Sequence, residues 1–169
     1  DAAPGVLADA HNNTGLIHWQ QGRYEQALAE MRQCSELAGR MGDRFRIAAT
    51  VMNMGIIQER LGRFHAACRS HESALELSER LGFRQGACAA LANLSNLCLI
   101  ERKPREALDY AARSRQIARD IGDRRSEAIA EENMGLACLL TKDFGAANGH
   151  FSRGMRLAHA LGDLERQVS

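Results

Sequence analysis

The 169-residue sequence is poor in aromatic residues and proline, and it has no long apolar run. Aromatic residues make up 5% of the chain, and Pro4 and Pro104 are its only prolines, whereas alanine and leucine are abundant. This composition favours helices, because Ala and Leu have high helix propensity and proline interrupts few segments. No apolar run approaches the roughly 20 residues that cross a bilayer. We therefore expect no membrane segment, and the N-terminus has no secretory signal pattern.

An excess of charge of one sign is also missing. The 22 Lys and Arg residues nearly balance the 21 Asp and Glu residues, which gives a net charge of +1. A protein that binds nucleic acid or an anionic membrane through its electrostatic field needs a basic surface. Neither partner is therefore expected.

Motifs for metal binding and catalysis are absent as well. Five cysteines form no CxxC pair, and the six histidines form no HExxH motif. Scattered cysteines in odd number are typical of reduced, buried thiols in a cytosolic protein, so we expect a cytoplasmic location and core packing for these side chains. No phosphate-binding loop or Ser-His-Asp pattern is present. We expect no metal, no cofactor and no catalytic activity.

What the sequence does contain is a repeat of 40 residues. Three residue types recur with this spacing in all four copies: Gly42, Gly82, Gly122 and Gly162; Ala27, Ala67, Ala107 and Ala147; Asn13, Asn53, Asn93 and Asn133. The repeats are 11–50, 51–90, 91–130 and 131–169, and residues 1–10 match the end of a preceding repeat. We interpret residues 1–169 as a single array and expect it to be a segment of a longer protein.

Each repeat contains two helical patterns. In the second repeat the first helix is expected from about Arg44 to Leu61, and the second from about Phe64 to Leu81. The inner face of the second helix consists of Ala67, His71, Ala74, Leu75 and Ser78, at the three- and four-residue spacing of an amphipathic helix. Because one helix pair cannot bury both its faces, neighbouring pairs must stack. The predicted fold is an all-α solenoid of four helix-turn-helix units, with eight helices and partial flanking helices.

Turn residues mark the ends of these helices. A glycine closes each second helix, where it suits the left-handed backbone conformation. The residue after it is suited to cap the next helix in three repeats, namely Asp43, Asp123 and Asp163. Phe83 takes this place in the other repeat, so the helix over 84–101 should start less cleanly. After Gly162, residues 163–169 are expected to begin a further first helix.

Within a repeat, Gly22 and Gly62 are expected to make the turn between the two helices, and Arg102 and Lys142 replace them later. Small residues also recur inside the helices. Besides the alanine series, the first helices carry a small residue at one position: Gly15, Gly55, Ser95 and Gly135. Small side chains allow close helix packing, so larger ones should overpack these contacts.

These motifs together resemble a known family. The pattern N-[LM]-[GS], followed by a Gly, an aromatic residue and a central Ala, resembles the tetratricopeptide repeat over essentially the whole chain. The variant with "LGD" between repeats is similar to arrays in Pins-type polarity adaptors and in bacterial signalling ATPases and transcription regulators. The resemblance implies a right-handed superhelix whose first helices line a concave groove.

The asparagine before the Leu/Met-Gly pair is the main candidate site residue. In arrays similar to O-GlcNAc transferase, such residues form a ladder that holds an extended peptide by its backbone, and Asn13, Asn53, Asn93 and Asn133 match this position. A carboxamide both donates and accepts hydrogen bonds, as a peptide unit requires. The alternative is a structural hydrogen bond to a neighbouring helix. Further groove candidates are Asn12, Trp19, Gln20, Met52, Glu59, Arg60, Asn96 and Glu132.

The sequence therefore predicts a non-catalytic protein–protein interaction module that binds an extended or helical peptide of a partner in the groove. The alternative is a regulatory or sensor segment of a larger signalling ATPase or transcription regulator, which acts intramolecularly or through a small ligand. Self-association through the truncated ends of the array is a further expectation, because solenoids usually need capping helices.

Overall fold

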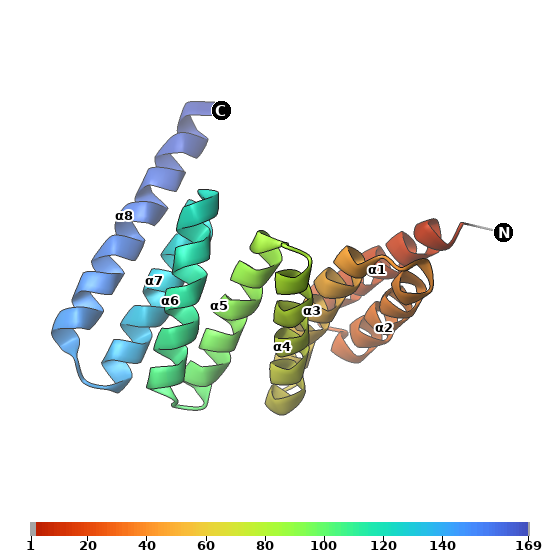
Figure 1. Ribbon diagram of the computed structural model, residues 1–169, viewed down its shortest axis with the longest axis horizontal. Coiled ribbons are helices and arrows are strands. Elements are labelled where there is room, and N and C mark those ends of the chain that lie inside the picture. The colour runs from red at the N-terminus through yellow and green to blue at the C-terminus, as the bar shows by residue number, and fades with distance from the viewer. Residues whose placement is uncertain (1–2, 169) are drawn as a thin grey trace. The chain divides into compact units, whose positions relative to one another are not determined.

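The computed structural model describes residues 3–168, and their side chains as far as residue 162. These residues form helices joined by short turns, and the described chain contains no strand (Figure 1). The helices are α1 (Pro4–Gln20), α2 (Tyr24–Met41), α3 (Arg44–Arg60), α4 (Phe64–Arg80), α5 (Arg84–Ile100), α6 (Pro104–Ile121), α7 (Arg124–Leu140) and α8 (Phe144–Val168). The predicted all-α fold of helix-turn-helix pairs is confirmed.

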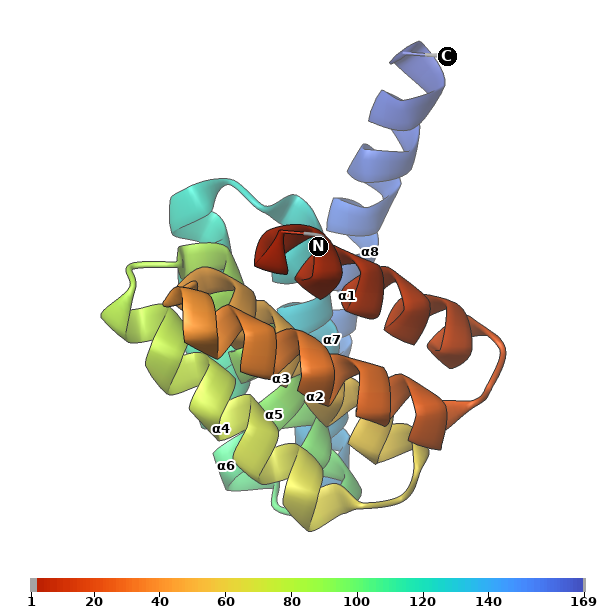
Figure 2. The same cartoon turned by 90° about the vertical axis from the view of Figure 1, so that its right-hand side faces the viewer.

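The chain divides into two compact units, Asp1–Gly86 and Ala87–Ser169. In the first unit α1 packs against α2, α2 against α3, and α3 against α4. In the second unit α7 packs against both α6 and α8. Paired helices run antiparallel, as α1 and α2 or α7 and α8 do in Figures 1 and 2. Odd-numbered helices are thus the first helices of repeats, and even-numbered helices the second.

The buried faces follow the predicted pattern. In α4 the buried residues are the five predicted ones: Ala67, His71, Ala74, Leu75 and Ser78. In the first unit Ala27, Leu28 and Met31 of α2 form a core cluster with Ile57 of α3. In the second unit Cys98, Ala107 and Ala137 join α5, α6 and α7. All five cysteines are free thiols, and all but Cys68, which is partly exposed, are buried.

The small residues of the first helices allow close contact with a bulky residue of the second helix. A Cβ atom on Gly55 would lie 2.4 Å from Cε1 of His71, and one on Gly135 would lie 2.6 Å from Cε1 of Phe151. In the third repeat the small residue is Ser95, and Ala111 takes the place of the bulky partner. The predicted role of the small residues in close packing is confirmed.

The turns carry the expected backbone conformations. Gly22, Gly42, Gly62, Gly82 and Gly122 have positive φ, and Arg102 (φ 57°) and Lys142 (φ 62°) adopt the same conformation where they replace glycine. Two of the predicted caps are present. The side chains of Asp43 and Asp123 accept hydrogen bonds from the backbone N–H of Arg46 and Ser126. A cap that the sequence analysis missed is Asp143, whose Oδ1 accepts from the N–H of Ala146 at 3.0 Å.

One prediction about a helix end is wrong. α8 does not turn at Gly162 but continues to Val168, so Asp163 is not an N-cap and residues 163–168 do not begin a new first helix. A continuous helix keeps its backbone hydrogen bonds through Gly162 at the modest cost of one internal glycine. α5 starts at Arg84, the same repeat position as Arg44 and Arg124, with Phe83 in the place of their capping Asp.

The cap of α7 leads to a testable prediction. Asp123 accepts from the N–H of Ser126 at 3.0 Å and from its hydroxyl at 2.6 Å. Asp123→Ala removes both bonds and should lower the free energy of unfolding by about 1 kcal/mol in urea titrations. Asp123→Asn retains an acceptor and should lose clearly less. Equal losses for the two variants would argue against capping as the cause.

None of the helices in the described part of the chain combines the length and the apolar character needed to cross a membrane.

Candidate functional site

The first candidate site is a pocket among α1, α2 and α3 in the first unit, which we call the Asn53 pocket. It has a volume of about 220 Å³. It is lined by Leu16, Trp19, Met31, Asn53, Ile56 and Ile57. Two of the predicted groove residues, Trp19 and Asn53, are thus brought together, and the rest of the lining is apolar. The pocket fits an apolar side chain next to one carboxamide.

The polar atoms of this pocket have no partners within the described residues. The Trp19 ring packs against the core cluster, and its Nε1 atom is buried without a hydrogen-bond acceptor. Asn53 is half-buried, and its side chain forms no hydrogen bond with the described part of the chain. The buried indole N–H of Trp19 thus lacks an acceptor, which costs free energy, whereas the carboxamide of Asn53 is partly accessible to a ligand.

The four asparagines of the predicted ladder differ in their surroundings. Asn133 is buried, and its Nδ2 donates to the carbonyl oxygen of Ala92 on α5 at 3.2 Å. Its carboxamide therefore joins two consecutive first helices. Asn13 is exposed, whereas Asn53 and Asn93 are half-buried. The structural use that the sequence left open thus applies to Asn133.

The other groove candidates are spread over the first helices. Glu59 accepts a hydrogen bond from the buried His71 on α4, with Oε1 2.7 Å from Nε2, so its carboxylate has a partner within the protein. Asn12 and Met52 are half-buried. Gln20, Arg60, Asn96 and Glu132 are exposed.

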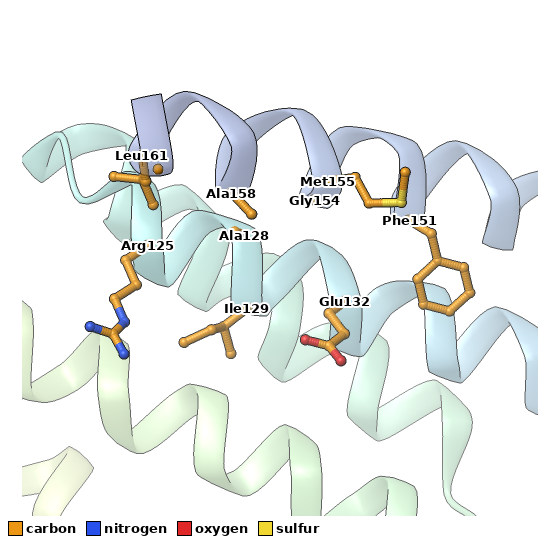
Figure 3. Close-up of a pocket in the computed structure, with 10 residues that line it drawn as sticks. Arg125, Ala128, Ile129, Glu132, Phe151, Gly154, Met155, Ala158 and Leu161 are labelled. Carbon is orange, nitrogen blue, oxygen red and sulfur yellow. The ribbon is translucent and has the colours of Figure 1, made fainter. Parts of the chain in front are cut away.

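A second and larger pocket lies between α7 and α8 in the second unit, and we call it the α7–α8 pocket. Its volume is about 770 Å³. Figure 3 shows Arg125, Ile129 and Glu132 in a row along α7, beside a second row along α8. The second row consists of Phe151, Gly154, Met155, Ala158 and Leu161. Its lining is mainly apolar, and it includes one predicted residue, Glu132.

A buried charge cluster beside this pocket was not predicted. Glu131 of α7 has no exposed surface. Its Oε1 accepts from Nη1 of Arg115 at 3.1 Å, and its Oε2 accepts from Nε of Arg153 at 3.0 Å and lies 2.7 Å from Nδ1 of His150. Burial favours the protonated acid, but the hydrogen bonds with His150, Arg115 and Arg153 outweigh it and lower the pKa of Glu131. The cluster ties α6, α7 and α8 together.

One signal in the sequence would have revealed part of this cluster. His11 and Glu30 occupy the repeat positions of Glu131 and His150, with the two residue types exchanged. In the structure Nδ1 of His11 lies 2.6 Å from Oε2 of Glu30, so both repeats contain the same contact in reverse. No group of three or more His, Cys, Asp or Glu side chains among the described residues is placed to hold a metal ion.

Solved structures with the same fold are numerous but distant in sequence. BtubC (BKLC) from P. vanneervenii has a TM-score of 0.85 at 19% identity, over 96% of this chain and 67% of that chain. Aspartyl phosphate phosphatase F from Bacillus subtilis has a TM-score of 0.90 at 14% identity, over 96% of this chain and 43% of that one. A Rap protein complexed with competence and sporulation factor has a TM-score of 0.80 at 12% identity, over 95% and 45%. The chain thus spans less than half the length of the latter two proteins.

Family models identify the repeat itself. A comparison with curated proteins gives no match. Two models described as tetratricopeptide repeat match residues 8–40 and 46–120, which together are more than half of the sequence. The matched segments contain three members each of the recurring Asn and Ala series, and most of the helix pairs α1–α2, α3–α4 and α5–α6. The chain belongs to the tetratricopeptide repeat family.

Proposed function

We propose that this chain is a non-catalytic protein-interaction module, which binds an extended or helical peptide segment of a partner protein along its first helices. The observation that carries the proposal is the Asn53 pocket. It combines a free carboxamide, a buried indole N–H without an acceptor and apolar walls. The free thiols of the chain fit a reducing, cytoplasmic compartment.

In this proposal the peptide places an apolar side chain against Leu16, Trp19 and Ile56, and Asn53 hydrogen-bonds its backbone. A carboxamide can satisfy both the C=O and the N–H of one peptide unit. Asn93 is half-buried, and we assign it the same role in its own unit. Asn133 is not included, because its Nδ2 already donates to Ala92. Each hydrogen bond to the backbone contributes about 0.5–1.5 kcal/mol net.

The test begins with peptides selected from a random phage-displayed library on the wild-type chain. Trp19 is the only tryptophan, so its fluorescence reports binding at this pocket. The selected peptides should carry a bulky apolar residue and should change the Trp19 emission. Asn53→Ala should weaken their affinity by about five- to 150-fold, the loss of two hydrogen bonds to one peptide unit.

The matched control is Asn148→Ala, which removes an exposed asparagine of α8, a second helix, that lines neither pocket. It should leave the affinity unchanged, and circular dichroism should show equal helix content for both variants. Equal affinity of wild type, Asn53→Ala and Asn148→Ala for every selected peptide would reject the proposed role of Asn53. Failure to select any peptide would reject peptide binding by this chain.

A further inference from the structure

A third pocket, in the second unit, is formed by α6, α7 and α8, and we call it the arginine pocket. Its volume is about 250 Å³. Its lining consists of three arginines, two glutamates and a leucine: Arg119, Glu127, Glu131, Arg153, Arg156 and Leu157. The α7–α8 pocket is mainly apolar, whereas this one is lined almost entirely by charged side chains. The arginine pocket is therefore suited to a charged ligand.

The carboxylates of this pocket are buried, and its guanidinium groups are exposed. The side chain of Glu131 has no exposed surface, and that of Glu127 is 14% exposed. The side chains of Arg119 and Arg153 are 50% and 38% exposed, and Arg156 is exposed as well. The pocket thus presents positive charge to solvent.

Two of the three arginines have donors that the protein does not use. Arg119 donates from Nε to Oε1 of Glu127 at 2.6 Å, and no contact within the described chain uses its two Nη groups. Arg156 forms no hydrogen bond or ion pair with the described side chains. Arg153, by contrast, already pairs with Glu131. Free guanidinium donors from α6 and α8 therefore line the same pocket.

The charges of the pocket depart from the repeat pattern. The positions of Glu127 and Glu131 on α7 are held by Ile47 and Val51 on α3. A buried ion pair is usually no more stabilising than well-packed apolar residues in its place, because the desolvation of the charges offsets their attraction. The stability of the fold therefore does not explain why α7 carries charges here.

The arginine pocket occupies a place in the repeat that stays open when further helices follow. The position of Arg156 is held by Glu36 on α2 and by Gln116 on α6. Both are exposed, although α3 packs on α2 and α7 packs on α6. The pocket also lies on the other side of α8 from the α7–α8 pocket, since Arg153 is roughly half a helical turn away from Met155.

We infer that the arginine pocket binds a phosphorylated side chain of a partner protein, with Arg119 and Arg156 holding the phosphoryl oxygens. A phosphoryl group carries a charge of about −1.5 to −2 and three acceptor oxygens. Because these oxygens point in different directions, guanidinium groups from two helices can both donate to them. A carboxylate has two oxygens in one plane and would use only one of the two.

The size of the pocket favours a group carried by a protein. Cavities that enclose a small-molecule ligand have volumes of about 300–1,000 Å³, and the arginine pocket, at about 250 Å³, is smaller. It suits one modified side chain that a larger partner presents at the surface. The Asn53 pocket lies in the other unit and takes no part in this contact.

The experiment measures how degenerate peptide libraries with a fixed phosphoserine, phosphothreonine or phosphotyrosine bind to the complete 169-residue chain, by fluorescence anisotropy. At least one phosphorylated library should bind more tightly than its unphosphorylated counterpart. Arg156→Gln should weaken this binding by about tenfold or more, the loss of charge-assisted hydrogen bonds. The matched control is Arg105→Gln, which removes an exposed arginine of α6 outside the pocket and should have no effect. Both arginines are exposed, and circular dichroism should show equal helix content for the two variants.

Phosphorylated libraries that bind no better than unphosphorylated ones would overturn the inference, and so would equal weakening by Arg156→Gln and Arg105→Gln. Two further ligands test the source of the anion. Inorganic phosphate that binds as tightly as the phosphorylated peptides would indicate a site for a free anion, and a library with a fixed glutamate that does so would indicate an acidic peptide. Either result would contradict the inferred partner. Asn53→Ala should leave the effect of phosphorylation unchanged, so failure here leaves the proposed function intact.

Discussion

Glu131→Ala is expected to lower the free energy of unfolding by about 3 kcal/mol, the largest loss among the single substitutions considered. The carboxylate is fully buried and is the common partner of Arg115, Arg153 and His150. Its removal leaves cationic groups from two helices facing one another without an anion. The expected loss is at the low end of the range for buried ion pairs, because the side chains of Arg115 and Arg153 partly reach solvent.

Glu127→Ala is the matched control for this substitution. Glu127 lies one turn earlier on α7 and pairs with Arg119, whose side chain is half exposed. An ion pair at the surface contributes at most about 1 kcal/mol. Chemical unfolding of both variants in urea measures the difference. Similar losses for Glu127→Ala and Glu131→Ala would show that burial of the cluster adds nothing.

The same cluster should make stability depend on pH. The pKa of Glu131 is lowered in the folded state. In the unfolded chain it returns to about 4.3. Between these two values the unfolded state binds more protons, so stability is present above pH 4.3 or so and is lost as the pH falls through the folded pKa. Asp43 and Asp123 act in the same direction. The contribution of Glu131 is therefore measured as the difference between wild type and Glu131→Gln, which should shrink with acidification.

The second large effect is expected for Gly55→Ala, which should destabilise the first unit by about 1–3 kcal/mol through overpacking. The new methyl group would lie within 2.4 to 2.8 Å of three atoms of the His71 ring. That ring has no exposed surface and is fixed by its 2.7 Å hydrogen bond to Glu59. It can move aside only by giving up this bond or by displacing the surrounding core.

A double-mutant cycle tests this cause directly. In a His71→Ala background the space beside Gly55 is open, so Gly55→Ala should cost little there, and the coupling free energy should be of the same size as the original loss. Gly39→Ala on α2 is the control for helix propensity, because nothing lies within 4 Å of its Cβ position. It should be neutral or stabilise by up to about 1 kcal/mol. An additive cycle would contradict a steric clash between Gly55 and His71.

The helices of this protein were predictable because each depends on short-range signals that recur. α3 and α4 end within one residue of their predicted bounds, and the buried face of α4 was predicted completely. A Gly with positive φ, a capping Asp and an apolar spacing of three or four residues each act within a few residues of sequence. Because these three signals recur every 40 residues, they can be distinguished from chance occurrences of the same residues.

The candidate site was predictable only in part, because a side chain's partner depends on distances between helices. Trp19 and Asn53 were both predicted and do line one pocket. Nothing in the repeat pattern distinguishes Asn53 from Asn133, although only the latter donates to Ala92. Glu131 stands where other repeats have Val51 and Leu91, and its partners come from 16 to 22 residues away on two other helices.

By itself the sequence determined the repeat, the order and limits of most helices, and the positions where small side chains allow a second helix to pack closely. These features follow from backbone preferences and from periodicity along one chain. The tertiary structure decided which asparagine is committed to a neighbouring helix, which carboxylate is buried among cations, and that α8 continues through Gly162. Those outcomes depend on which side chains another helix brings within hydrogen-bonding or packing distance. These side chains come from residues far apart in sequence, so the pattern along the chain does not show which of them meet.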